Sequence, residues 1–193
     1  DYLFTGEEAG KILTLIDFIK IEGLSGNIKN IKKMKKVANY EFDYEKIINI
    51  YKKNKILVHA SYVIGYDYDD KNCFDEILEF SKKHKFFLAG FNPALPIPGT
   101  PFYERLKKEG RLLYERWWLD ENFRYGKACF EPYNMTIEEF EAGILKCKVE
   151  YNRHSSIWKR LFDGAANFKH ALVFLAVNYI NRKEVYNKKG IKL

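Results

Sequence analysis

The pattern of apolar and polar positions is most informative between residues 56 and 101. Ile56 to Ile64 is apolar or β-branched almost throughout, with His59 and Ser61 as its polar members, and Gly65 ends the run. Such a run is typical of a strand that is covered on both faces, as in a parallel sheet. The pattern therefore predicts a buried strand at this place in the chain.

The residues that follow predict a helix and then a second strand. From Lys71 to His84 the apolar side chains recur on one helical face, and Phe86 to Asn92 is again strand-like. A strand, a helix of this length and another strand make a right-handed βαβ unit. Ligands bind beyond the carboxyl ends of the strands in such units. We therefore expect the site at residues 65–70 and 92–101.

Four of the five prolines lie between Pro93 and Pro101. Proline fixes φ and has no backbone N–H, so this segment forms neither a regular ladder nor a helix. The sequence predicts a stiff, extended loop that leaves the carboxyl end of a strand. Within it, Pro96, Pro98 and Gly99 are the residues expected to shape a pocket wall.

Apolar spacing predicts more helices on both sides of this unit. Thr136 and Glu139 have the spacing of a capping box, which marks the start of one of them. The predicted helices are 11–19, 43–54, 102–109, 136–151, 155–162 and 167–182. The second half of the chain is therefore expected to be mostly helical, with an irregular, aromatic-rich segment before residue 136.

Charge and composition change this picture little. The net charge of +7 over 193 residues is moderate and fits a solvated, lysine-rich surface. The basic run from Lys29 to Lys36 lacks the interleaved aromatic residues with which proteins stack single-stranded nucleic acid. Nucleic acid is therefore not favoured as a partner.

The cysteines and the apolar runs bear on the cellular compartment. Cys73, Cys129 and Cys147 are odd in number and widely separated, which argues against a disulfide scaffold and fits a reducing cytoplasm. No metal motif is present. The longest apolar stretch, Ala171 to Ile180, is too short to span a bilayer. We expect a cytoplasmic protein without a transmembrane segment.

Several stretches resemble the end of the barrel and the tail of radical S-adenosylmethionine (SAM) enzymes, in particular those with an N-terminal cobalamin-binding domain. They are ASYVIGYDYDD, PIPGTPFYERL, WWLDENFRYG and FEPYNMTIEEFEAG. The resemblance extends from about Glu22 to Trp158, whereas the CxxxCxxC motif that defines the family is absent.

This resemblance implies an α/β fold: a partial (β/α) barrel of radical SAM type over residues 19–110, followed by a mostly helical C-terminal domain over residues 111–193. Residues 1–18 resemble a remnant of an N-terminal, cobalamin-binding-like domain. The alternative is that the first twenty residues are an unrelated strand and helix. In the family, the first half of the barrel separates the two regions.

The resemblance also implies where SAM would bind. Ser61, Val63 and Gly65 match the positions of the fifth-strand motif that touches adenine, and Asn92 ends the sixth strand, where it meets adenine or substrate. Small side chains at Ser61 and Gly65 let a flat ring approach the backbone. The alternative is that both are small for packing reasons. Two further candidates, which would face the ribose, are Glu22 and Ser25.

The function that this resemblance implies is the C-terminal portion of a radical SAM enzyme, which forms part of the SAM and substrate pocket and is inactive alone. SAM would bind weakly, and a 4Fe-4S cluster and cobalamin would occur only in full-length relatives. Two alternatives stay open, a non-catalytic scaffold module and a basic RNA-binding remnant. The expected partners are an unknown small-molecule substrate and either a second copy or the missing barrel half.

Overall fold

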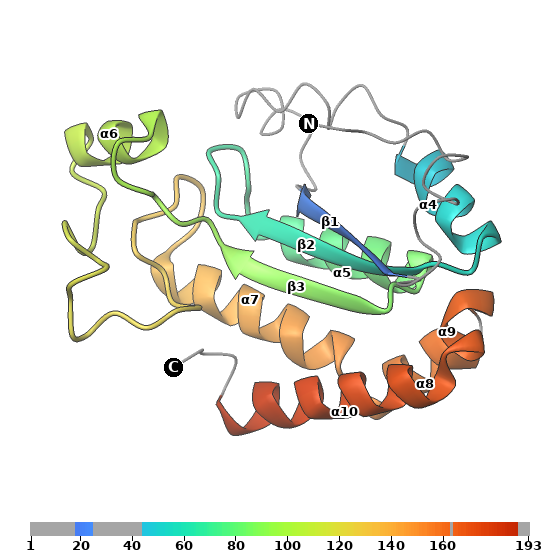
Figure 1. Ribbon diagram of the computed structural model, residues 1–193. Helices are drawn as coiled ribbons and strands as arrows, with labels where there is room; N and C mark the ends of the chain where they lie inside the picture. The colour runs from blue at the N-terminus through green and yellow to red at the C-terminus, as the bar shows by residue number, and fades with distance from the viewer. Residues whose placement is uncertain (1–17, 25–43, 163, 189–193) are drawn as a thin grey trace.

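The computed structural model contains a three-stranded parallel sheet with helices on one face and beyond one edge (Figure 1). It describes residues 18–24, 44–162 and 164–188. The strands lie in the order β1-β2-β3, each parallel to its neighbour. Their bounds are β1 (Phe18–Leu24), β2 (Leu57–Ile64) and β3 (Leu88–Pro93). The predicted βαβ unit is thus confirmed.

Seven helices lie within the described residues. They are α4 (Tyr44–Lys53), α5 (Cys73–His84), α6 (Pro101–Lys108), α7 (Ile137–Tyr151), α8 (His154–Phe162), α9 (Ala165–Lys169) and α10 (Ala171–Asn187). The capping box of α7 is confirmed, since the Thr136 side chain accepts from the Glu139 N–H and the Glu139 carboxylate accepts from the Thr136 N–H. Both bonds satisfy donors that a helix start otherwise leaves unpaired.

Two helix predictions need correction. The helix expected over 167–182 is divided between α9 and α10, because the chain leaves helical geometry at His170. The helix expected over 11–19 is wrong at its end, since Phe18 and Ile19 belong to β1. The remainder of that segment lies outside the described residues.

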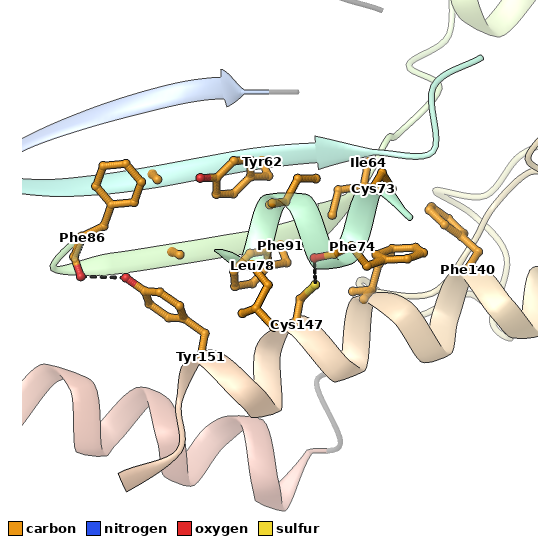
Figure 2. Close-up of a cluster of buried hydrophobic side chains, with 14 of the residues drawn as sticks. Tyr62, Ile64, Cys73, Phe74, Leu78, Phe86, Phe91, Phe140, Cys147 and Tyr151 are labelled. Carbon is orange, nitrogen blue, oxygen red and sulfur yellow. Dashed lines mark hydrogen bonds between the residues drawn. The ribbon is translucent and has the colours of Figure 1, made fainter. Parts of the chain in front are cut away.

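The main core lies between one face of the sheet and the helices α5 and α7 (Figure 2). Tyr62 of β2 and Phe91 of β3 point into it, with their rings stacked at 5.5 Å. Tyr151 at the end of α7 donates its hydroxyl to the Phe86 carbonyl at 2.7 Å. Since this core joins residues from both sides of Gly110, the two parts of the chain pack as neighbours, and a domain boundary at residue 110 stays a prediction.

The helices α8, α9 and α10 pack against a second core at the start of β2 and β3. Arg160 of α8 is fully buried there and donates to the carbonyls of Phe86 and Phe87 at 3.0 and 2.9 Å. Asn178 of α10 accepts from the same guanidinium at 2.9 Å. These bonds tie the C-terminal helices to the strand that carries Asn92.

The covering of β2 differs from the prediction. Its side chains alternate between buried and half-buried, whereas the apolar run predicted burial on both faces. The even-numbered positions face α5 and α7, and the odd-numbered positions lie on the opposite face. That opposite face, here called the open face, positions the candidate site.

Candidate functional site

The open face of the sheet carries the small and polar side chains of β2 and β3. The register pairs Ser61 with Gly90 and Val63 with Asn92, so these four residues form two adjacent rows. Ser61, Val63 and Asn92 are half-buried. Three of the predicted SAM-binding residues are therefore brought together on one surface.

A cavity of about 230 Å³ lies where the open face meets the edge of β3. From the sheet it is lined by His59, Ser61, Gly90 and Asn92, among others. A Cβ atom at Gly90 would lie 3.3 Å from Nδ2 of Asn92 and 3.5 Å from Nε2 of His59. The glycine therefore keeps room between two polar side chains.

Polar residues of α7 and α10 form the other side of this cavity. Those that line it are Lys148, Asn152, Asn181, Glu184 and Lys188. Asn181 donates to the side-chain oxygen of Asn152 at 3.1 Å, which links the two helices. A cavity with donors, acceptors and both signs of charge suits a polar ligand that has several hydrogen-bonding groups.

Sequence reasoning missed these helical residues. The pattern of α7 and α10 indicates which positions are apolar, but not which polar positions face a strand more than 50 residues away. Only Asn152 could have been singled out from the sequence, because it is a polar residue immediately after the last residue of α7. Its side chain is 1% exposed, which is unusual for an asparagine.

The carboxyl end of β2 is held by the protein's own polar groups. Asp69 accepts from the N–H groups of Gly65 and Tyr66 at 2.9 and 3.1 Å. Asp67 pairs with both terminal nitrogens of the Arg105 guanidinium, and this carboxylate raises the pKa of Arg105. The acids after β2 thus order a loop.

Asn134, from the segment before α7, completes this loop. Its side-chain amide donates to the carbonyls of Asp67 and Asp69 at 2.9 and 3.3 Å. The loop after β2 is therefore held in place by Arg105 of α6 and by Asn134, which are both distant from it in sequence.

Gly65 lies where it was expected, at the end of β2, but its neighbours are aromatic side chains. It has a φ of 98°, and a Cβ there would lie 2.5 Å from the Phe140 ring and 3.3 Å from the Phe130 ring. The space beside Gly65 is thus occupied by the protein. Close packing against these rings is enough to explain a glycine at this position.

The proline-rich loop packs toward a third core rather than over the cavity. The buried residues of this core are Ala94, Leu106, Trp117, Phe123, Cys129 and Phe130. Pro96 is buried, and its carbonyl accepts from the indole N–H of Trp117 at 2.8 Å. Pro98 and Gly99 are exposed and are not among the residues that line the cavity at the β3 edge. Thr100 caps α6 by accepting from the Tyr103 N–H at 3.3 Å.

The two ribose candidates are only partly placed. Glu22 pairs with Ser61 in the register of β1 and β2, which puts it in the same row as Gly90. Ser25 lies outside the described residues. Val63 packs against the third core, which includes Trp117, at the carboxyl end of the sheet.

The cysteines do not form a ligand set for an iron–sulfur cluster. Burial raises the pKa of Cys129 and of Cys147 to about 12 and raises that of Cys73 further. Cys147 donates to the Phe74 carbonyl (Figure 2). The described residues contain no group of three or more His, Cys, Asp or Glu side chains that could hold a metal ion. Buried thiols of this kind are packing residues.

No family model matches the chain. It is 27% identical over 177 residues to bacteriochlorophyllide d C-12(1)-methyltransferase of Chlorobaculum tepidum, a match that covers 92% of this chain and 37% of the relative. The chain resembles one part of a methyltransferase. Bacteriochlorophyllide d C-8(2)-methyltransferase of the same organism is 28% identical over 74 residues, which cover 38% of this chain and 16% of the relative.

Almost all of this chain matches the C-12(1)-methyltransferase, but the chain spans only 37% of the length of that relative. The match covers 92% of this chain. None of the helices that the structure describes combines the length and apolar content that a membrane span needs.

Proposed function

We propose that the chain is the C-terminal portion of a radical SAM methyltransferase and that the open face of its sheet forms part of the SAM and substrate pocket. The observation that carries this proposal is the pair of rows formed by Ser61, Gly90, Val63 and Asn92, with the cavity beside them. The similarity to a bacteriochlorophyllide methyltransferase supports methyl transfer as the reaction class.

The layering of the sheet supports a segment of a (β/α) barrel. Three parallel strands follow one another in sequence order, and α5 connects β2 to β3 on the covered face. In such barrels the helices lie outside and the opposite face of the sheet lines the interior, with the active site at the carboxyl ends of the strands. The open face corresponds to that interior.

The chain's own residues would bind the nucleoside end of SAM. Gly90 leaves the strand backbone accessible to a flat ring, and the amide of Asn92 both donates and accepts, as an adenine edge requires. The hydroxyl of Ser61 lies in the adjacent row. A volume of about 230 Å³ is below the ~300–1,000 Å³ of whole ligand sites, so the cavity would hold part of SAM.

The 4Fe-4S cluster has no ligand set among the described residues, so we assign binding and no chemical step to this chain. A cluster, and cobalamin, would belong to the longer protein of which this chain represents a part. The chain alone is then inactive and binds SAM weakly, because the described residues hold no cluster that would anchor the methionine end.

Ligand-observed NMR tests the nucleoside site. We expect SAM and 5′-deoxyadenosine to bind the chain in the millimolar range. Gly90→Val should abolish the signal, since its side chain fills the room between His59 and Asn92, while a β-branched residue suits a strand. Gly99→Ala is the control, because no atom lies within 4 Å of its Cβ position. An unchanged signal in folded Gly90→Val would show that nucleosides do not bind at the open face.

A specific observation favours a scaffold as the second candidate. The outer side of α10 exposes an apolar row in which Leu172, Val173 and Ile180 are 86%, 54% and 64% exposed. Exposed apolar rows of this kind mark interaction surfaces. A second copy of the chain, or the rest of the longer protein, would cover it.

Light scattering at increasing concentration tests this second candidate. We expect the wild-type chain to self-associate and the double variant Leu172→Glu, Ile180→Glu to be monomeric, because a carboxylate at each position opposes burial of the row. Lys108→Glu, which changes an exposed side chain of α6 away from this row, should leave association unchanged. A wild-type chain that stays monomeric at high concentration contradicts the scaffold.

A further inference from the structure

A larger cavity, of about 670 Å³, lies away from the open face, between the end of α5, the end of α7 and the helix α8. Its volume is within the ~300–1,000 Å³ of sites for small molecules. The proposed SAM site does not use it, and the two cavities share none of their lining residues.

The lining of this cavity, here called the α8 pocket, is strongly cationic. Five of its ten residues are Lys or Arg and one is Glu, a formal balance of +4. The one carboxylate, Glu150, already pairs with Arg153 at 2.5 Å and lies 3.9 Å from Lys82. The remaining positive charge favours an anionic ligand.

Two aromatic rings that stack on each other present an outer ring face in the α8 pocket. Trp158 and Phe162 are 41% and 68% exposed, and their rings are stacked with centroids 5.6 Å apart and planes 18° apart. Large aromatic side chains are normally buried, and each exposed ring leaves a face available for stacking. A planar aromatic ligand would cover this surface.

Two buried polar atoms that line the α8 pocket have no hydrogen-bond partner in the described part of the chain. They are Oγ of Ser156, a residue that is 8% exposed, and Nε of Arg160, a residue that is 1% exposed. Such atoms are rare in folded proteins, because each one costs free energy unless a partner is supplied. Both atoms are shielded from the cavity as the lining stands, so the acceptor oxygens of a ligand would reach them only after a small shift of the lining.

The buried charge of Arg160 is an electrostatic reason to expect an anion in the α8 pocket. Its terminal nitrogens donate to the neutral oxygens of Phe86, Phe87, Tyr151 and Asn178, and no described carboxylate pairs with it. A buried charge without a counterion is costly. An anion in the α8 pocket would provide the missing negative charge.

We propose that the α8 pocket binds a small planar aromatic molecule that carries a phosphate or carboxylate group. The ring stacks on the exposed face of Trp158, whose other neighbour is Phe162, and the anion lies among Arg153, Lys159 and the buried end of Arg160. This site is independent of the open face, so it remains whether or not SAM binds there.

Ligand-observed NMR with two probes tests the proposal and distinguishes the two anions. Adenosine 5′-monophosphate presents a phosphate, and naphthalene carboxylate presents a carboxylate. We expect at least one of them to bind, about tenfold more tightly than adenosine, uncharged naphthalene methanol or inorganic phosphate, because each of these lacks one half of the recognised chemistry. Because these two probes also differ in their rings, naphthyl phosphate is compared with naphthalene carboxylate, and the one that binds more tightly identifies the preferred anion.

Variants locate the binding. Trp158→Ala and Lys159→Gln should each weaken the binding of the charged probe by about fivefold to tenfold, through loss of stacking and of charge respectively. Lys71→Gln, at an exposed position before α5, is the matched control. Gly90→Val should also leave this binding unchanged, which separates it from the proposed SAM site. If neither probe binds at millimolar concentration, or if the variants at Trp158 and Lys159 bind as the wild type does, the proposal is overturned.

Discussion

Arg160→Ala is expected to lower the free energy of unfolding by about 3 kcal/mol or more, because it removes a buried side chain and several hydrogen bonds at once. The guanidinium carbon lies 4.0 Å from the centroid of the Tyr151 ring, so the side chain fills space as well as donating. Without it, the Tyr151 carbonyl and the Asn178 amide oxygen lose this donor.

The carbonyls of Phe86 and Phe87 would each keep one hydrogen bond after this substitution. Each accepts a second bond, from the Tyr151 hydroxyl at 2.7 Å and from the Asn178 amide at 3.1 Å. The expected loss therefore comes from the cavity and from two unsatisfied acceptors, and only to a small extent from these carbonyls.

Urea unfolding followed by circular dichroism measures the change. Arg116→Ala is the matched control, since Arg116 is exposed and its removal should change the stability by less than about 0.5 kcal/mol. Arg160→Lys should lie between wild type and Arg160→Ala, because it keeps a charge but loses the forked geometry. A stability of Arg160→Ala within about 1 kcal/mol of the wild type would contradict the role assigned to this network.

The local parts of the fold could be predicted from the sequence. The strand–helix–strand unit follows from a largely apolar run, a helical face and a second run. Thr136 with Glu139 predicts the start of α7 within a residue. These signals are local, since the periodicity of a strand or helix is read within one segment.

The break at His170 could not be predicted, and a contact with a residue distant in sequence lies beside it. Asn167 donates to the carbonyls of Lys85 and Arg160 at 2.9 and 2.8 Å, which holds α9 against the end of α5 and against α8. The apolar period continues through this point, so the sequence alone favours one helix.

The candidate site was predictable on the sheet and not elsewhere. Ser61, Val63 and Asn92 were predicted from the resemblance to radical SAM enzymes, and the register of β2 and β3 brings them together. The pair formed by Asp67 and Arg105 spans 38 residues, and no local pattern specifies such a pairing. Gly65 was located correctly, but its aromatic neighbours come from segments 65 or more residues further along the chain.

Gly65→Ala is expected to destabilise the chain by about 2–5 kcal/mol, from two separate causes. A φ of 98° is unfavourable for any residue with a Cβ, at a cost of about 1–2 kcal/mol. The added methyl group would also lie 2.5 Å from the Phe140 ring, and overpacking of this kind costs about 1–3 kcal/mol.

Two further variants separate these causes. Gly99→Ala shares the positive φ, at 78°, but has no atom within 4 Å of its Cβ position, so it should cost only the backbone strain. Phe140→Leu removes ring atoms from the space beside Gly65, and Gly65→Ala should cost less in that background, with a coupling of about 1 kcal/mol or more in a double-mutant cycle. If Gly65→Ala and Gly99→Ala are equally destabilising and the cycle shows no coupling, Phe140 does not occupy the space beside Gly65. That space would then be available to a ligand ring, as the resemblance to radical SAM enzymes first suggested.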